Sequence, residues 1–367
     1  MKKYDLLKVL GISLLITFFL SWFIPAGTFS SGSFVSSEAT NPLGLYDLFK
    51  IPVYVINRFV QYVLLFLAIG GFYGVLNKSG VYSKIVEDVV GKYKTKRKTF
   101  LIISIVLFSL LSSVLGLSNV ILILVPFFVT VLLKLEFSKI NSLAATIGAM
   151  LVGQIGSLIE TEIGGYALFS NLIGSGSALG LWGVYDVITI LIIFSIIIAW
   201  LYNVKMKDFI EGFISGMKEM LKPAIYATLA CVVFEVILNL GGTDFVNTIV
   251  NKLAGENFTM LGTTFATLVS SLFYNDFYTL IATMATPFST FDANVMQIIA
   301  FTFQVMFGLV MLIAPTSIFL LAGLSYLEIS YKEWVKYIYK YVLIVFGIFI
   351  WIAIMINVII PFISNLI

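Results

Sequence analysis

Four short polar sequences interrupt long apolar stretches, and their side chains could hold a small polar solute. They are Ser118-Asn119, Glu160-Thr161-Glu162, Asn275-Asp276 and Pro315-Thr316-Ser317. Ser, Thr and Asn supply neutral donors and acceptors, and Asp and Glu supply negative charge. A helix that stops there also leaves N–H donors at one end, which attract anions, and carbonyl acceptors at the other, which attract cations. Each interruption could instead be a surface loop or a helix cap, since Ser, Asn and Asp are favoured N-cap residues.

Carboxylates in or beside the apolar segments are the second chemical feature. An ionisable residue at membrane depth is costly and by default functional, which draws attention to Glu160, Glu162, Asp276 and Glu235. Because no Lys or Arg is expected at comparable depth, these carboxylates should meet a cation: Na⁺, a transferable proton or an amino group of the substrate. For the three glutamates, a position at the membrane boundary is the alternative.

Two glutamines, Gln154 and Gln304, lie within apolar segments, where they would either line the same cavity or join helices by hydrogen bonds. Together these features define a candidate set of substrate- and ion-binding residues. The set is Ser118, Asn119, Gln154, Ser157, Glu160, Thr161, Glu162, Asn275, Asp276, Pro315, Thr316 and Ser317. A coupling Na⁺ would lie near Asn119, Glu160, Asp276 and Thr316. We expect no other cofactor.

The composition requires a membrane setting for these residues. Of the 367 residues, 60% are hydrophobic and 11% are charged, and the mean hydropathy is +1.06, whereas an ordinary soluble domain is about a quarter charged. There are no histidines and one cysteine, which excludes His/Cys zinc sites, Ser-His-Asp triads and disulfides within the chain. We therefore expect no enzyme. The net charge of +3 is too balanced to indicate a nucleic-acid partner.

The apolar segments predict an all-α polytopic membrane protein with seven crossings and two hairpins. Unbroken spans are expected at about 9–24, 59–76, 184–202, 224–240 and 341–360, and polar residues break the others. The first could pass for a signal peptide, but no small-residue cleavage site follows it. Gly70-Gly71 in the second span predicts close approach of another helix. The paired pieces 100–115 and 120–133 are either two tight spans or a re-entrant hairpin.

The basic residues orient the chain. With the N-terminus inside and each broken run taken as a hairpin, 19 of the 22 Lys and Arg residues fall on the inside. The positive-inside rule then predicts a cytoplasmic N-terminus and an external C-terminus in the plasma membrane. The Lys-rich stretch 77–98 is consistent with a cytoplasmic loop, for which nucleic-acid binding is the alternative.

The order of elements occurs twice, which predicts an inverted repeat. Ser112-Ser113 matches Ser270-Ser271, and Gly153 and Thr161 match Gly308 and Thr316 on corresponding elements. We expect a first helix and external loop at 1–58, one repeat at 59–203 and the other at 204–367. Secondary transporters use this arrangement, with the site at the midplane where broken helices meet. A channel could also be inverted, but no filter or charged ring is evident.

Several patches resemble the YfcC/DcuC-type carriers, a family of anaerobic dicarboxylate carriers and arginine/ornithine antiporter-like proteins in the ion transporter superfamily. The patches are 22–27 (WFIPAG), 70–80 (GGFYGVLNKSG), 209–212 (FIEG), 314–317 (APTS), 322–324 (AGL) and 331–336 (YKEWVK). The resemblance implies two re-entrant hairpins, two broken transmembrane helices, a homodimer and elevator-like movement, with Pro315-Thr316-Ser317 at the second broken helix. In the first repeat, Glu160-Thr161-Glu162 stands where an Asn-Pro-containing tip is expected.

These observations lead us to expect an ion-coupled secondary transporter, a symporter or an exchanger, that binds a small-molecule substrate in a lipid membrane. The carboxylates without basic partners favour an amino acid, such as arginine or ornithine. A four-carbon dicarboxylate or another small organic anion is the alternative substrate. A non-transporting membrane scaffold is the alternative class.

Overall fold

The computed structural model describes residues 5–25, 27–30, 33–36, 42–115, 118–156, 183–239, 243–254, 260–284 and 293–355. Within these ranges the chain is nearly all helical, apart from the antiparallel pair β1 (Gly27–Ser30) and β2 (Ser33–Ser36). Five helical stretches there are long and apolar enough to cross a membrane: Asp5–Phe23, Val60–Lys78, Val184–Leu201, Met206–Ile237 and Tyr331–Ile354. The prediction of a polytopic, largely α-helical membrane protein is confirmed in these terms, whereas the inverted repeat and the two re-entrant hairpins stay predictions.

The chain forms two compact units. The first comprises Met1–Arg58, Leu229–Ile318 and Ser330–Ile367, and the second comprises Phe59–Thr228 and Phe319–Ile329. The first holds α1 (Asp5–Phe23), β1, β2, α2 (Leu45–Arg58), α13 (Val232–Asn239), α14 (Thr243–Ala254), α15 (Met260–Ser270), α16 (Phe277–Met284), α17 (Ala293–Met311) and α19 (Tyr331–Ile354). The three segments expected from the repeat pattern stay a prediction.

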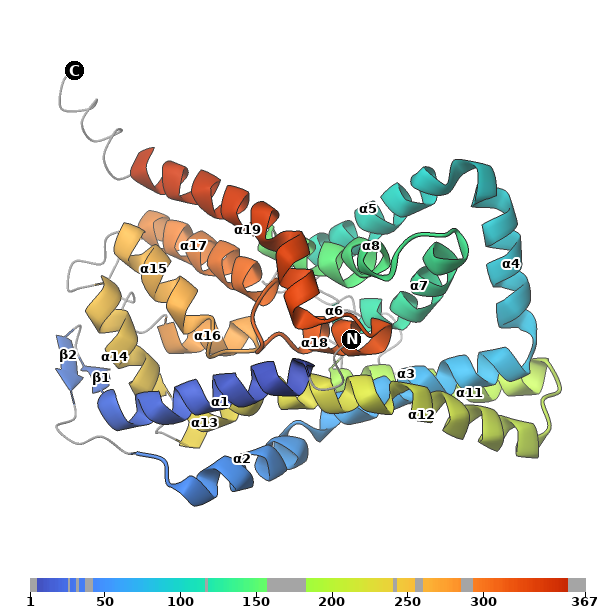
Figure 1. The fold of residues 1–367 in the computed structure, drawn as a ribbon, viewed down its shortest axis with the longest axis horizontal. Helices are drawn as coiled ribbons and strands as arrows, with labels where there is room; N and C mark the ends of the chain where they lie inside the picture. Colours follow the sequence, from blue (N-terminus) through green and yellow to red (C-terminus); the bar gives the residue numbers. More distant parts are fainter. Residues whose placement is uncertain are drawn as a thin grey trace. The chain divides into compact units, whose positions relative to one another are not determined.

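The second unit contains α3 (Val60–Lys78) and α4 (Val81–Tyr93), and nearly all of α18 (Ile318–Leu327). Between α4 and α18 lie η1 (Lys94–Lys96), α5 (Arg97–Leu115), α6 (Ser118–Ile121), η2 (Leu122–Leu124), α7 (Val125–Lys134), α8 (Lys139–Leu143), the π-helical turn η3 (Ala144–Gly148), α9 (Ala149–Ile155), α11 (Val184–Leu201) and α12 (Met206–Leu229). Helices α3, α11 and α12 lie side by side in this unit (Figure 1).

Glycines bring α3 and α12 into backbone contact. A Cβ atom at Gly74 would lie 1.9 Å from the carbonyl oxygen of Gly212, and one at Gly70 would lie 2.2 Å from that of Gly216. Residue numbers rise along α3 as they fall along α12, so the helices run antiparallel. Small residues four apart permit this approach in a membrane, where apolar side chains gain little by leaving lipid. The close approach predicted at Gly70-Gly71 is confirmed.

Tyrosine hydroxyls fix the irregular start of α7. Pro126 cannot donate a backbone hydrogen bond, and the chain before it takes the tighter 3₁₀ form of η2. Tyr73 of α3 donates to the carbonyl of Ile123 at 2.7 Å, and Tyr82 of α4 donates to Thr130 Oγ1 at 3.0 Å. Burial raises the pKa of the Tyr82 phenol, so it remains a protonated donor at neutral pH.

Candidate functional site

The interruption between α17 and α18 lies at the predicted Pro315-Thr316-Ser317 sequence. Helix α17 ends at Met311 and α18 begins at Ile318, because a proline has no N–H to continue the helical ladder. Two of the carbonyls freed there accept bonds from the start of α19. Trp334 Nε1 donates to the oxygen of Leu312 at 2.8 Å, and the Tyr331 hydroxyl donates to that of Ile313. Side-chain hydrogen bonds from α19 therefore hold the break in a defined conformation.

Thr316 has a buried hydroxyl at this break. Its side chain is fully buried, as is that of Ser317, and Thr316 Oγ1 has no hydrogen-bond partner among the described residues. Most buried polar groups in proteins are paired, and leaving one unpaired costs about 1–3 kcal/mol. An unpaired hydroxyl beside the start of a helix is thus placed to bind a polar solute.

Asn275 and Asp276 lie between α15 and α16, and both are half-buried. The Asp276 carboxylate accepts a bond from the backbone N–H of Thr279 at 2.8 Å and another from the Thr279 hydroxyl, so it caps the N-terminus of α16. Asn275 Nδ2 donates to the sulfur of Cys231 at 2.8 Å. Asp276 is therefore a helix cap, which is the alternative interpretation given for this sequence. Asn275 instead contacts Cys231, which precedes α13.

A buried serine with an unpaired hydroxyl occurs in both predicted repeats. Ser112 on α5 and Ser270 at the end of α15 are buried, and neither Oγ has a hydrogen-bond partner among the described residues. Their neighbours are paired: Ser113 donates to the carbonyl of Gly156 at 2.7 Å and Ser271 to that of Thr267 at 2.6 Å. The sequence matched these two serine pairs between the repeats but did not indicate which hydroxyls would be left unpaired.

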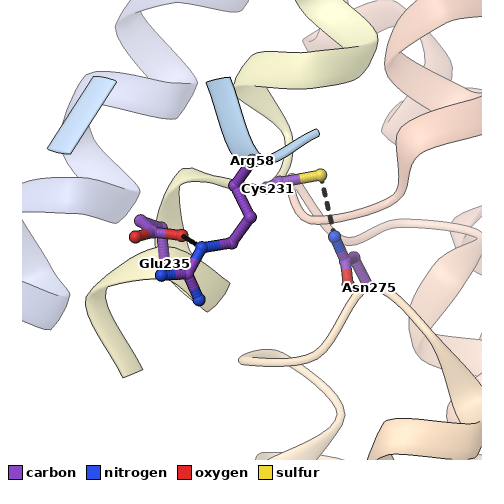
Figure 2. Close-up of polar contacts among 4 residues, drawn as sticks. All are labelled: Arg58, Cys231, Glu235 and Asn275. Atoms are coloured by element: carbon purple, nitrogen blue, oxygen red, sulfur yellow. Dashed lines mark hydrogen bonds and ion pairs between the residues drawn. The ribbon is translucent and has the colours of Figure 1, made fainter. Parts of the chain in front are cut away.

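Glu235 on α13 has a basic partner, which corrects the expectation that these carboxylates lack one. Arg58 Nε, at the end of α2, lies 3.0 Å from Glu235 Oε2, and the Glu235 side chain is 1% exposed. One turn earlier, the thiol of Cys231 accepts the bond from Asn275. Figure 2 shows the two contacts on opposite sides of this turn. For Glu235 the expectation was wrong, because Arg58 reaches this carboxylate from a distant part of the sequence.

The structure describes only some of the other candidate residues. Gln154 is half-buried on α9, and Ser118 and Asn119 begin α6. Four candidates lie outside the described residues: Ser157, Glu160, Thr161 and Glu162. Within the first unit, the structure brings Asn275 to Cys231 and Arg58 to Glu235, and it places Thr316 and Ser317 at the break after α17. The binding roles of the candidates stay a prediction.

A comparison with known families decides the general identity of the chain. The sequence profile of DcuC, the C4-dicarboxylate anaerobic carrier family, matches residues 5–164 and 166–359. The chain belongs to this family. It is a transporter of the secondary-carrier type rather than an enzyme, as the sequence predicted. No curated protein and no solved structure matches it. The DcuC match favours the four-carbon dicarboxylate alternative over the amino-acid substrate that we expected first.

Proposed function

We propose that this DcuC-family protein carries C4-dicarboxylates across the plasma membrane by ion-coupled symport or exchange. The observation that carries the proposal is the family match over nearly the whole chain. The paired state of Glu235 also supports a dicarboxylate, because it removes one of the carboxylates that favoured a substrate with an amino group. An amino-acid substrate has no support from the family match.

The proposed substrate site uses neutral donors and helix ends. The chain contains only two arginines, Arg58 and Arg97, and both are in ion pairs. A substrate carboxylate would instead meet the Thr316 hydroxyl and the N-terminal end of α18, where backbone N–H groups favour an anion. Ser270 and Asn275 would supply further polar contacts. Where Na⁺ is the coupling ion, it would bind near Asn119, Glu160, Asp276 and Thr316.

The proposed transport architecture is an inverted repeat with two re-entrant hairpins, α5–α7 and α15–α16, in a homodimer. Its N-terminus is cytoplasmic and its C-terminus external. The support is the repeated element order, the break at Pro315 and the unpaired hydroxyls at the matched positions Ser112 and Ser270. Such hydroxyls would line the surfaces that a polar substrate passes.

Uptake by purified protein in proteoliposomes tests the function. Labelled succinate should accumulate, and unlabelled succinate or fumarate should compete with it, whereas labelled arginine should not enter above the level of empty vesicles. Gradients of Na⁺ and of protons are imposed separately to identify the coupling ion. Uptake of arginine but not of succinate would contradict the proposed substrate, and uptake of neither would contradict the carrier function.

Replacing Thr316 by Val tests the proposed site. Valine keeps the volume but removes a hydroxyl that has no protein partner among the described residues, so stability should be unchanged or raised by up to about 1 kcal/mol. Loss of a contact to substrate should weaken succinate affinity about three- to tenfold. The matched control is Thr302→Val, whose hydroxyl donates to the carbonyl of Ile298 and should affect affinity little. Equal effects of the two variants on affinity would exclude Thr316 from the site.

A further inference from the structure

The buried ion pair between Arg58 and Glu235 carries an inference that rests on the proposed function. We propose that Glu235 is the proton-coupling group of the carrier and that Arg58 and the Cys231–Asn275 contact link its protonation to the substrate site. The four residues all belong to the first compact unit, and their two contacts meet the chain one turn apart, at Cys231 and at Glu235 (Figure 2).

Glu235 is a buried carboxylate whose basic partner is half-exposed. The Glu235 carboxylate is 1% exposed on a helical stretch that is long and apolar enough to span the membrane. An ionisable group in such a place is costly to keep and is most often functional. Its partner Arg58 has a side chain that is 52% exposed. Under the proposal, a proton reaches the carboxylate along the exposed side of the guanidinium.

Protonation of Glu235 changes the net charge of the ion pair. With Glu235 ionised, the pair has no net charge. A proton from water converts the carboxylate to a neutral carboxyl group, while the guanidinium keeps its charge at any physiological pH, so the pair becomes +1. A C4-dicarboxylate carries two negative charges when fully ionised, and a positive charge near its site stabilises it. Protonation and substrate binding therefore favour each other, as coupled transport requires.

The turn that leads to Glu235 contacts the candidate residue Asn275. Cys231 lies one turn before Glu235, and its sulfur accepts the bond from Asn275, which lies between α15 and α16. The ring centroids of Phe234 and Tyr274, the residues that precede Glu235 and Asn275, are also 5.6 Å apart. A shift of α13 when the ion pair opens would therefore act directly on Asn275 and release its amide for the substrate.

Other charged groups on the neighbouring helices are less well placed than Arg58. Helices α1, α2 and α14 contact α13. Besides Arg58, the charged residues on these helices are Asp5, Lys8, Asp47, Lys50, Asp244 and Lys252.

Several of these groups have other partners or lie away from Glu235. The Asp5 carboxylate accepts a bond from the backbone N–H of Tyr331, and the Lys252 side chain is exposed. Asp47 and Lys50 lie more than two turns before Arg58 on α2. Among the described residues, the Cys231 thiol also interacts electrostatically with Glu235, and Asp276 follows Asn275.

Succinate transport by Glu235→Gln tests the proposal. In proteoliposomes with the membrane potential held at zero, a gradient of one pH unit should drive about tenfold accumulation per coupled proton in the wild type. The variant should lose this accumulation and the pH dependence of uptake. It should retain exchange of labelled for unlabelled succinate, because exchange moves no net proton. Glu136→Gln, which removes the exposed carboxylate that pairs with Arg97, is the matched control and should behave as the wild type.

A second variant distinguishes a loss of proton coupling from misfolding. Arg58→Gln combined with Glu235→Gln removes both charges of the pair, and this variant should also exchange succinate without responding to the pH gradient. The proposal is overturned if Glu235→Gln still accumulates succinate, if only a Na⁺ gradient drives the wild type, or if both variants lose exchange together with accumulation. Absence of any wild-type succinate uptake would refute the proposed function instead.

Discussion

The two arginines of the chain form two Arg–Glu pairs in very different surroundings. Arg58 lies 3.0 Å from Glu235, whose side chain is 1% exposed, whereas Arg97 lies 3.4 Å from Glu136, whose side chain is 83% exposed. The residue types are the same, but water solvates one carboxylate and not the other. The difference teaches that burial, rather than residue identity, decides whether an ion pair can hold a fold together or respond to a proton.

Removing each arginine alone should give the largest contrast. Arg58→Gln takes the guanidinium from a buried carboxylate and should lower the free energy of unfolding by about 3–5 kcal/mol. Arg97→Gln should lower it by no more than about 1 kcal/mol, because water already solvates Glu136. Denaturant unfolding of the detergent-solubilised protein measures both values. A small and equal loss in the two variants would show that burial does not distinguish the pairs.

Neutralising both partners should recover most of the loss at the buried pair. The double variant Arg58→Gln, Glu235→Gln leaves neither member of this pair charged, so its stability should lie within about 1–2 kcal/mol of the wild type. The double-mutant cycle gives the coupling energy between the two side chains. If the double variant is as unstable as Arg58→Gln alone, then an uncompensated carboxylate is not the source of the instability.

Raising the salt concentration should produce the smallest effect. Screening should lower the coupling energy of the exposed pair more than that of the buried pair. Raising NaCl from about 0.1 M to about 1 M shortens the Debye length from about 10 Å to about 3 Å. The coupling energy of the exposed pair, at most about 1 kcal/mol, should then fall to near zero. The coupling energy of the buried pair should change little over the same range. A parallel decline at both pairs would indicate that water reaches Glu235 freely.

The sequence predicted those parts of the fold that depend on local chemistry. The end of α17 follows from Pro315, the long apolar helices follow from composition, and the close helix approach follows from Gly70-Gly71. The helix that makes this approach, through Gly212 and Gly216, could not be named. Adjacent glycines indicate that another helix can approach the backbone of α3 closely, but they do not indicate which helix does so.

The candidate site could be predicted only in part, because its contacts join distant segments. Nothing near Glu235 in the sequence indicates that Arg58 would reach it, and that omission led to the amino-acid hypothesis. Buried Ser and Thr hydroxyls on helices usually return to a carbonyl of the preceding turn, as Ser271 does. Whether Ser270 or Ser271 would be left unpaired depends on the packing of neighbouring helices, which the sequence does not show.

The central claim is that the break at Pro315-Thr316-Ser317 binds the transported dicarboxylate. Labelling of Thr316→Cys with a membrane-impermeant thiol reagent, in a Cys231→Ser background, tests it most directly. The control is Thr95→Cys, at an exposed position between α4 and α5. The account predicts that the reagent modifies position 316 and that succinate slows this reaction while leaving position 95 unaffected. A rate at position 316 that succinate does not change would contradict the account.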